Sequence, residues 1–371
     1  MAKKPVKIKR NTSISGKKYH RKAAAKKALS ILFALGALIA LGFLGAPAVA
    51  EMIQNIKDRP QQIITEPSAE PTATPGEIVE PTTNPGDAQT DILQQTLVCN
   101  LVEAKNLLTE DAIRKQATLL KEKDVDLAVV TLKDKDGTVW YTSATEIGSQ
   151  AVSKQVVDVK KVVEIFTEND ISVVANVYTF MDKTAPDINR DTAVLYVGTD
   201  YKWLDTSKEF GGKPWTNPAS GVMQQYLYDL VQEINTEFGI KYFIFSGTQL
   251  PTGYSLDKRD FGVSDAALQA QLQGFIGTMQ SKVAAFGGDA FFEFDLAAIN
   301  GGDVAKYMVA PQRLGAVNIV VSGTTEDFVA ADIAAVSRKL KADFDVEKLV
   351  FRCTDGNLTD TIPEDDDYFV Q

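Results

Sequence analysis

From residue 96 onward the sequence alternates short β-branched segments with longer amphipathic segments, and this alternation constrains the fold more than any other feature. Apolar residues of the longer segments recur at i, i+3 and i+4, the spacing of a helix with one buried face. Strands that alternate with such helices predict a parallel sheet covered by helices. The predicted strands are Thr96–Leu101, Asp126–Leu132, Ile171–Tyr178, Lys241–Ser246, Ala290–Asp295, Val317–Val321 and Lys348–Phe351, with a weaker eighth at Tyr307–Ala310.

Eight parallel strands would close a barrel. The segment from residue 96 to residue 371 has about 275 residues, close to the ~250 of a typical β/α barrel. The sequence therefore predicts an α/β domain of the (β/α)8 TIM-barrel type.

The predicted helices carry start and stop signals. Thr109 and Ser264 each precede an amphipathic segment and can cap its first N–H groups. Asn217-Pro218 predicts another helix start, because proline suits the first helical position, and Gly239 predicts the end of that helix. A further helix is expected after Thr325.

The N-terminal segment has the pattern of a membrane anchor. The first 27 residues hold eleven Lys or Arg and no acid, and 23 uncharged residues follow from Ala28 to Ala50. As a helix this apolar segment would reach about 34 Å, enough for a bilayer core of about 30 Å, and its basic flank is expected to stay in the cytoplasm. A cleaved signal peptide is the alternative, because Ala48-Val49-Ala50 has the small-x-small pattern of a cleavage site.

Residues 51–95 are predicted to form a linker. Six prolines lie between Pro60 and Pro85, interleaved with Thr, Glu, Ala and Gly. Such a composition cannot bury enough apolar surface to fold, so the segment is expected to be disordered and partly extended. The predicted organisation is a basic cytoplasmic leader (1–27), a transmembrane helix or signal peptide (28–50), a Pro/Thr-rich disordered linker (51–95) and a TIM-barrel domain (96–371).

The charge balance excludes one class of partner. Eleven of the 39 basic residues lie in the leader, so the remainder carries 28 basic residues against 49 acids, a net charge of −21. A surface this acidic would repel a phosphate backbone, and nucleic acid is therefore not an expected partner.

Two cysteines, Cys99 and Cys353, lie near opposite ends of the predicted domain. The first and last strands of a closed eight-stranded barrel are neighbours, so these cysteines are expected on adjacent strands. A disulfide is compatible with an exported domain, whereas two cysteines without a spacing motif are more often small buried apolar residues. The sequence leaves both interpretations open.

One predicted strand ends in a serine and a glycine. The segment Phe245-Ser246-Gly247-Thr248-Gln249-Leu250-Pro251 resembles the signature of a bacterial family of uncharacterised, glycoside-hydrolase-like TIM-barrel proteins related to the amylases. In that family the strand usually ends in Phe-Asp-Tyr-x-Arg-Phe-Pro, of which this chain keeps the Phe and the Pro. The resemblance implies a degenerate member in which Ser246 replaces a strand-end carboxylate.

Further segments carry the same resemblance over about residues 95–250. Leu132–Gly137 is similar to the family's lysine-acid-x-Gly loop, and Tyr141–Ser143 matches its Tyr-x-Ser. Tyr178–Asp182 is similar to its Phe-x-Asp, and its two tryptophan motifs correspond to Trp203–Asp205 and Trp215–Pro218. The resemblance fades after Asp295, and the family's proline-tyrosine motif near the seventh strand is missing at Val320–Gly323.

The candidate catalytic residues are Glu293 and Asp295. Side chains alternate along a strand, so both acids of the Ala290–Asp295 strand are expected to face the barrel mouth, where active sites of such barrels lie. The resemblance places an acid of the family at Asp295. It also implies that Thr131, two residues before the family's lysine at Lys133, replaces a second acid.

Several other kinds of site are excluded or unsupported. Glycoside hydrolysis ordinarily needs two carboxyl groups, and Ser246 stands where one of them is expected. The sole histidine, His20, lies in the leader, which excludes a Ser-His-Asp triad and a histidine metal site in the domain. No metal and no cofactor are expected.

Sugar binding requires aromatic faces and polar groups rather than a tuned pair of acids. The expected binding residues lie in loops or at strand ends on the predicted active face. They are Lys133, Asp134, Tyr141, Tyr178, Asp182, Trp203, Trp215 and Ser246, with Trp140 beside Tyr141. Packing of Trp203 and Trp215 within their own loops is the competing interpretation.

The sequence thus predicts a single-pass, membrane-anchored glycoside-hydrolase-like barrel whose domain lies outside the cytoplasmic membrane, or is secreted if the leader is cleaved. We expect it to have lost catalysis and to bind or sense a cell-wall or extracellular glycan. One alternative is an active hydrolase that uses Asp295 with a relocated carboxylate, from Asp134, Asp136 or Asp182. The other is a structural or protein-interaction module of the cell envelope, without a groove and with buried tryptophans.

Overall fold

The computed structural model describes residues 98–301, 304–355 and 367–369. The predicted leader, apolar segment and linker (1–95) lie outside these residues. Among the helices that the structure describes, none combines the length and the apolar character that crossing a bilayer requires.

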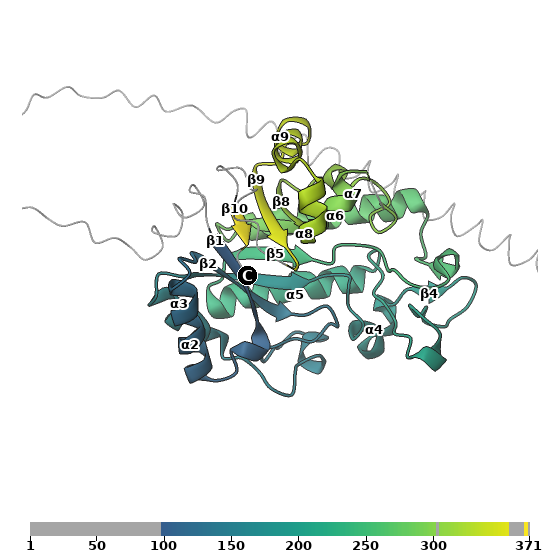
Figure 1. Ribbon diagram of the computed structural model, residues 1–371. Helices are drawn as coiled ribbons and strands as arrows, with labels where there is room; N and C mark the ends of the chain where they lie inside the picture. The colour runs from purple at the N-terminus through teal and green to yellow at the C-terminus, as the bar shows by residue number, and fades with distance from the viewer. Residues whose placement is uncertain (1–97, 302–303, 356–366, 370–371) are drawn as a thin grey trace, which may run out of the picture. The chain divides into compact units, whose positions relative to one another are not determined.

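The domain is built on one parallel sheet (Figure 1). Its strands follow one another in the order β1-β10-β9-β8-β7-β5-β3-β2, and every neighbouring pair is parallel. All strands therefore end on the same side of the domain. The strands are β1 (Val98–Glu103), β2 (Leu127–Lys133), β3 (Ser172–Tyr178), β5 (Tyr242–Ser246), β7 (Ala290–Asp295), β8 (Asn318–Gly323), β9 (Lys348–Cys353) and β10 (Asp367–Phe369).

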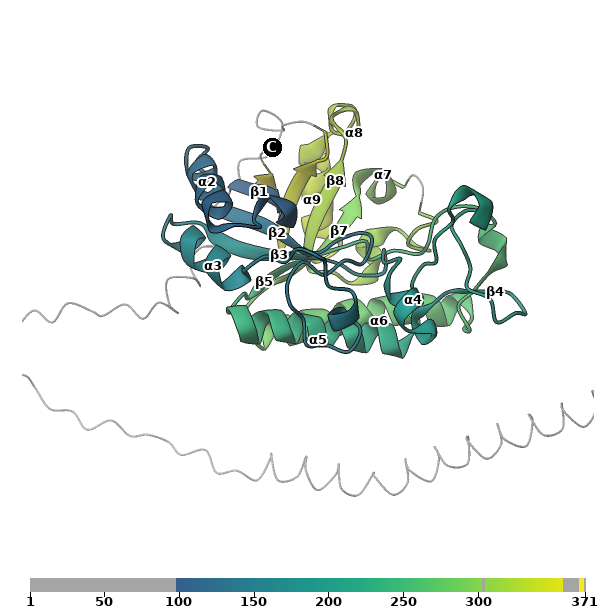
Figure 2. The same ribbon diagram turned by 90° about the horizontal axis from the view of Figure 1, so that it is seen from below.

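The helices lie around this sheet. Figure 2 shows α5 and α6 along one side of it. The α-helices are α2 (Glu110–Lys121), α3 (Val159–Thr167), α4 (Ala185–Ile188), α5 (Gly221–Phe238), α6 (Asp265–Ala284), α7 (Leu296–Ile299), α8 (Thr325–Ala330) and α9 (Ile333–Asp343). Short 3₁₀ helices are η2 (Ala104–Asn106), η3 (Gly148–Gln150), η4 (Arg190–Thr192), η5 (Lys208–Phe210), η6 (Leu256–Lys258) and η7 (Pro311–Leu314).

The prediction of a regular TIM barrel is corrected by this arrangement, whereas the predicted transmembrane segment lies outside the described residues. Seven strands of five to seven residues form a half-barrel-like parallel sheet, and only the three-residue β10 bridges its two edges. Between β7 and β8 the crossover carries a four-residue helix and a 3₁₀ turn instead of a covering helix. Within the described residues no helix follows β9 or β10. The eightfold strand-and-helix repeat is therefore incomplete.

The weak eighth strand was expected in the wrong place. Residues 307–310 form no strand, and Pro311 starts η7 directly after them. The eighth strand is β10, which is three residues long and follows a run of acids, so its sequence shows no apolar alternation. The other seven strands lie where the alternation predicts them, within two residues at each end.

The sheet separates two apolar cores. A small core fills the inside of the curved sheet, with Cys99, Leu127, Val174, Ile244 and Phe291 among its members. A larger core lies between the sheet and the helices. Phe243, Phe245 and Phe292 belong to this outer core, because side chains alternate between the two faces of a strand.

The loops after β3 and β5 meet in an excursion away from the sheet. Two-residue strands β4 (Leu195–Tyr196) and β6 (Arg259–Asp260) pair antiparallel there. Trp203 and Trp215 form a third apolar core with Val194 inside this excursion. Both views place β4 on the opposite side of the domain from α2 and α3 (Figures 1 and 2).

The cap residues explain most helix boundaries. Thr109 and Ser264 accept hydrogen bonds from Ala112 N and Ala267 N, as the sequence predicts for N-caps. The helix expected at Asn217-Pro218 begins instead after Ser220, whose hydroxyl accepts from Met223 N. The Asn217 carboxamide oxygen accepts from Ala219 N and so caps a turn before the helix.

The two cysteines are not on adjacent strands, because β10 lies between β1 and β9. Cys99 packs inside the sheet and Cys353 packs in the outer core. Both are buried and neither forms a disulfide.

A pair of Gly→Ala substitutions tests the role of the left-handed cap. Gly239 ends α5 with φ 70°, and no atom lies within 4 Å of the position that a Cβ would take, so strain alone penalises alanine there. We expect Gly239→Ala to lower the free energy of unfolding by about 1 kcal/mol. Gly274 lies inside α6 with equal space, so Gly274→Ala should raise it by about 0.5–1 kcal/mol. Urea unfolding of both variants measures these changes. If both substitutions shifted the free energy of unfolding in the same direction, the cap assignment would be contradicted.

Candidate functional site

The strand ends carry a connected set of polar side chains inside the curved sheet. Asn176 on β3 donates from Nδ2 to Thr131 Oγ1 on β2 at 3.1 Å. Ser246 on β5 donates to Asn176 Oδ1 at 2.8 Å and also contacts Glu293 Oε2 on β7. Arg352 on β9 completes the set, with 2.7 Å from its Nη1 to Glu293 Oε1. We call these five residues the strand-end network.

Glu293 and Arg352 form the charged part of this network. Their side chains are 11% and 16% exposed, so the ion pair is largely removed from solvent. Burial opposes the charge of Arg352, but Glu293 and a hydrogen bond with Tyr178 favour it, and together they raise the pKa of Arg352. Burial, followed by the charge of Glu293, raises the pKa of the Tyr178 hydroxyl. Tyr178 is therefore neutral at ordinary pH.

A groove of about 300 Å³ lies over one side of the network. Trp140 and Tyr178 give it aromatic walls, and Arg352 reaches it from β9. Its other lining residues are Leu101, Glu103, Ala104, Lys105, Thr131, Asp134, Lys135 and Asp136. The groove thus combines aromatic faces with side chains of both charges.

Asp134 holds the Trp140 indole in place. Its Oδ2 accepts from Trp140 Nε1 at 2.9 Å. Its Oδ1 accepts from the backbone N–H groups of Asp136 and Thr138, which closes the turn between them. An indole fixed at its polar edge loses little conformational freedom when a ligand stacks on it.

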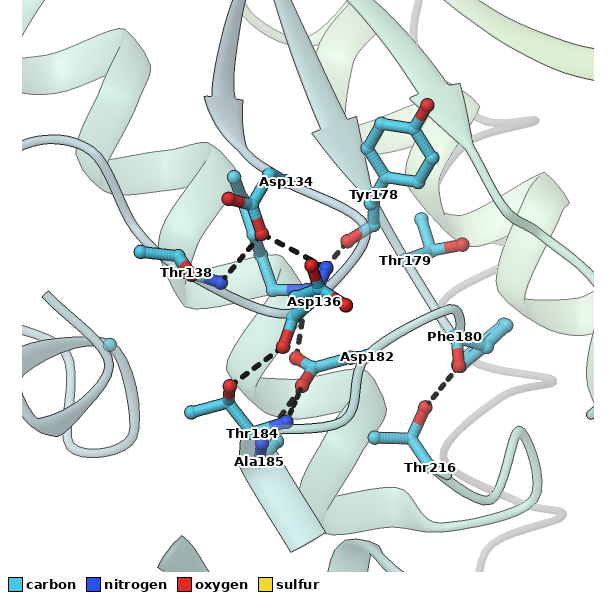
Figure 3. Close-up of polar contacts among 12 residues, drawn as sticks. Asp134, Asp136, Thr138, Tyr178, Thr179, Phe180, Asp182, Thr184, Ala185 and Thr216 are labelled. Carbon is cyan, nitrogen blue, oxygen red and sulfur yellow. Dashed lines mark hydrogen bonds and ion pairs between the residues drawn. The ribbon is translucent and has the colours of Figure 1, made fainter. Parts of the chain in front are cut away.

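A buried ion pair lies beneath the loops that follow β2 and β3, and Figure 3 shows its acid, Asp182, next to Thr184 and Ala185. Lys133 Nζ lies 2.8 Å from Asp182 Oδ2, and the two side chains are 0% and 1% exposed. Lys133 Nζ also donates to the carbonyl oxygen of Tyr178 at 2.7 Å. Asp182 Oδ1 accepts from the backbone N–H groups of Thr184 and Ala185 at 2.8 Å each. The pair therefore joins the loops after β2 and β3.

Gly137 packs directly on this pair. A Cβ at residue 137 would lie 2.0 Å from Asp182 Oδ1, and the residue has φ +90°. Glycine alone meets both conditions without strain. The lysine-acid-x-Gly motif of the sequence is thereby explained as a buried contact between Lys133, Gly137 and Asp182.

Apart from Asp295, the predicted site residues fall into two groups, those at the groove or the network beside it and those that are buried elsewhere. Asp134, Tyr178, Ser246 and Glu293 lie at the groove or in the network beside it. Lys133, Asp182 and Tyr141 are buried beneath the loops, and the Tyr141 hydroxyl donates to Glu233 Oε2 at 2.8 Å. Trp203 and Trp215 are buried in the excursion core, as the competing interpretation expects.

Asp295 lies apart from the groove. It accepts from Lys306 Nζ at 2.7 Å and from the Tyr307 hydroxyl at 3.2 Å. Burial, followed by the charge of Asp295, raises the pKa of Tyr307, so this hydroxyl stays a donor. Asp295 lines a separate cavity above β7, β8 and β9.

The sequence reasoning missed Arg352, Asn176 and Lys306. Arg352 follows Val350 by two residues on β9, and Asn176 follows Val174 by two on β3, so alternation with these inward apolar residues could have identified both. Lys306 lies in an irregular segment, and its contact with Asp295 follows from the tertiary fold alone. Within the described ranges, no three His, Cys, Asp or Glu residues come together as metal ligands.

Comparison with known proteins supports a glycoside-hydrolase-like fold. A family model described as "Putative glycosyl hydrolase domain" matches residues 101–295, more than half of the chain. No curated protein matches the sequence significantly. The glycoside hydrolase domain of PgaB (BpsB) from Bordetella bronchiseptica has a TM-score of 0.53 at 11% identity, over 74% of this chain and 94% of that domain.

Two other solved structures are similar at lower TM-scores. A hypothetical protein from Ruminiclostridium thermocellum ATCC 27405 has a TM-score of 0.44 at 20% identity, over 52% of this chain and 96% of that one. A GH20 exo-β-N-acetylglucosaminidase from Vibrio harveyi has 0.46 at 12% identity, over 70% of this chain and 41% of that one. This chain therefore spans less than half of the Vibrio enzyme. The family model and these structures do not establish a relation to the amylases.

Removal of the buried lysine tests the role of the ion pair. Lys133→Met leaves Asp182 buried without its cation, so we expect the free energy of unfolding to fall by about 3–5 kcal/mol. Lys348→Met is the matched control, because Lys348 and Asp289 form a 2.6 Å pair that is partly exposed, worth at most about 1 kcal/mol. Chemical denaturation that gives the two variants equal losses would refute the assignment.

Proposed function

The chain belongs to the family described as "Putative glycosyl hydrolase domain", and we propose that its domain binds a cell-wall or extracellular glycan in the groove without cleaving it. One observation carries the proposal. Trp140 and Tyr178 line a 300 Å³ groove at the strand ends together with Arg352 and acidic side chains. Sugar rings present an apolar face and a rim of hydroxyls, and aromatic walls with convergent polar groups suit both.

The arrangement of the carboxylates supports the absence of cleavage. Hydrolysis requires two carboxyl groups that face the scissile bond from suitable distances. Both oxygens of Glu293 are held by the protein, one by Arg352 and the other by Ser246. The strand-end position on β5 carries the hydroxyl of Ser246 instead of an acid. Glu293 is thereby a structural partner of Arg352 rather than a group directed at a sugar.

An active hydrolase is the second candidate, and one observation favours it. Glu293 and Asp295 lie two residues apart at the carboxyl end of β7, on the same face of that strand. A glycan that displaced Arg352 would free the carboxylate of Glu293, and two carboxylates at the end of β7 could then face the glycan. The activity measurement below separates the two candidates.

A position outside the cytoplasmic membrane is part of the proposal. It is supported by the sequence alone, through eleven basic residues before the 23 uncharged residues 28–50. We expect the protein isolated from its host to keep its leader. N-terminal sequencing measures this, and a mature start at Glu51 would replace the anchored form by a secreted one.

A binding and release assay tests the proposed function. Full-length protein is incubated with cell-wall and plant polysaccharides, and retention and the release of reducing ends are both scored. We expect retention without release. Trp140→Ala should weaken retention about tenfold or more, because stacked aromatics contribute on the order of 1–2 kcal/mol. Tyr254→Ala is the control, since Tyr254 is an exposed aromatic that does not line the groove.

Activity in the wild type would overturn the absence of cleavage. Release of reducing ends that disappears in Glu293→Gln or Asp295→Asn would show that this carboxylate pair catalyses hydrolysis. Absence of retention on every polysaccharide, with Trp140→Ala unchanged, would overturn the binding function itself. Ser246→Asp adds an acid to the strand-end network, and we expect no turnover from it while Arg352 still holds Glu293.

A further inference from the structure

A second cavity lies at the strand ends, separate from the groove. Its volume is about 230 Å³, and it lies above β7, β8 and β9 beside α7 and α8. Its lining residues are Asp295, Ala297, Ala298, Lys306, Ser322, Gly323, Thr324, Asp327 and Thr354. We call this cavity the β7–β9 pocket. It is smaller than the ~300–1,000 Å³ of pockets for drug-sized ligands, so its size suits one sugar unit.

The polar groups of the β7–β9 pocket form an acceptor and donor pair. Lys306 Nζ lies 2.7 Å from Asp295 Oδ2, with side-chain exposures of 32% and 40%. An ammonium has three donors and a carboxylate has about four acceptor sites, so each group can bind a ligand while the pair stays intact. A donor beside an acceptor complements two adjacent hydroxyl groups. Bonds to these charged groups are stronger than neutral hydrogen bonds.

The pocket and the groove are neighbours in the sheet register. Asp295 on β7 is paired with Ser322 on β8, and Ser322 is paired with Arg352 on β9. Asp295 and Ser322 line the pocket, whereas Arg352 lines the groove. Asp295 and Arg352 are therefore two strand spacings apart, about 10 Å, and Ser322 of the pocket is the direct neighbour of Arg352.

We propose that the β7–β9 pocket is a second sugar-binding subsite that takes a sugar unit through its vicinal diol when a glycan chain lies in the groove. This inference rests on the proposed function of the groove. It assigns Lys306 and Asp295 to ligand binding. It also makes the protein selective for chains of several units over single sugars.

Calorimetric titration of full-length protein with oligosaccharides of one to six units tests the subsite. Cello-, xylo- and manno-oligosaccharides carry a 2,3-diol in every internal unit, whereas chito-oligosaccharides carry an acetamido group in place of the 2-hydroxyl. We expect affinity for the diol-bearing series to rise about tenfold or more with length before it levels off. Lys306→Met should lower the affinity for the longer ligands about tenfold and leave the affinity for the shortest ligands unchanged.

Two further variants make the result specific. Lys348→Met removes a lysine from a Lys–Asp pair of similar length and exposure at the opposite ends of the strands, and it should change no affinity. Ala297 is exposed and lines the pocket. Ala297→Phe should therefore fill the pocket without disturbing the core and reproduce the loss seen in Lys306→Met, including where Lys306→Met does not fold.

Each outcome supports or overturns the subsite. If affinity rises with chain length equally in wild type and in Ala297→Phe, the subsite is overturned. If binding in that case still requires Trp140, the proposed binding function of the groove is unaffected. If Lys306→Met weakens chito-oligosaccharides as much as the diol-bearing series, the assignment to the 2,3-diol of an internal unit is overturned. Failure of every series to bind would overturn the subsite and the proposed function together.

Discussion

The buried ion pair between Lys133 and Asp182 is the contact on which the rest of the strand-end architecture depends. Neither side chain reaches solvent, so each charge is compensated by the other and by hydrogen bonds to the backbone. The pair fixes the loop after β2, which carries Trp140, and the carbonyl of Tyr178 at the end of β3. Its removal would release both aromatic walls of the groove at once. We therefore regard the pair as positioning the groove without contacting a ligand.

The strand-end network decides what chemistry the groove can support. Arg352 and Ser246 each contact one of the two carboxylate oxygens of Glu293. The contacts with Glu293 and Tyr178 also hold Arg352 in place, and a fixed guanidinium loses little entropy on binding a ligand. This arrangement supports the proposal that the groove binds a glycan without cleaving it.

Much of the fold could be predicted from the sequence, and the wrong predictions have identifiable physical reasons. Seven strands follow from alternation of β-branched residues, and capping residues such as Thr109 locate helix starts. The closing strand β10 was missed because three residues beside a run of acids show no alternation, and the regular barrel failed because the crossover after β7 lacks a long helix. Asn217-Pro218 misplaced a helix start because a turn and a helix use the same cap chemistry.

The candidate site was predicted less well than the fold. Tyr178, Asp134 and Ser246 were placed correctly at the strand ends, because strand direction alone determines this. Exposure could not be predicted for Trp203 and Trp215, since they pack with Val194 inside the irregular loop between β3 and α5, and Phe261 from the loop after β5 packs against them. Arg352 was missed although its strand position predicts an inward side chain, because an arginine near a strand end is equally compatible with a solvated surface position.

An experimental structure of the protein with a bound oligosaccharide tests the central claim most directly. We expect a sugar ring stacked on Trp140 and next to Tyr178, with Glu293 still within hydrogen-bond distance of Arg352 and Ser246. A glycosidic bond seated over Glu293, with Arg352 displaced and a second carboxylate facing the same bond, would contradict the account and identify the protein as a hydrolase.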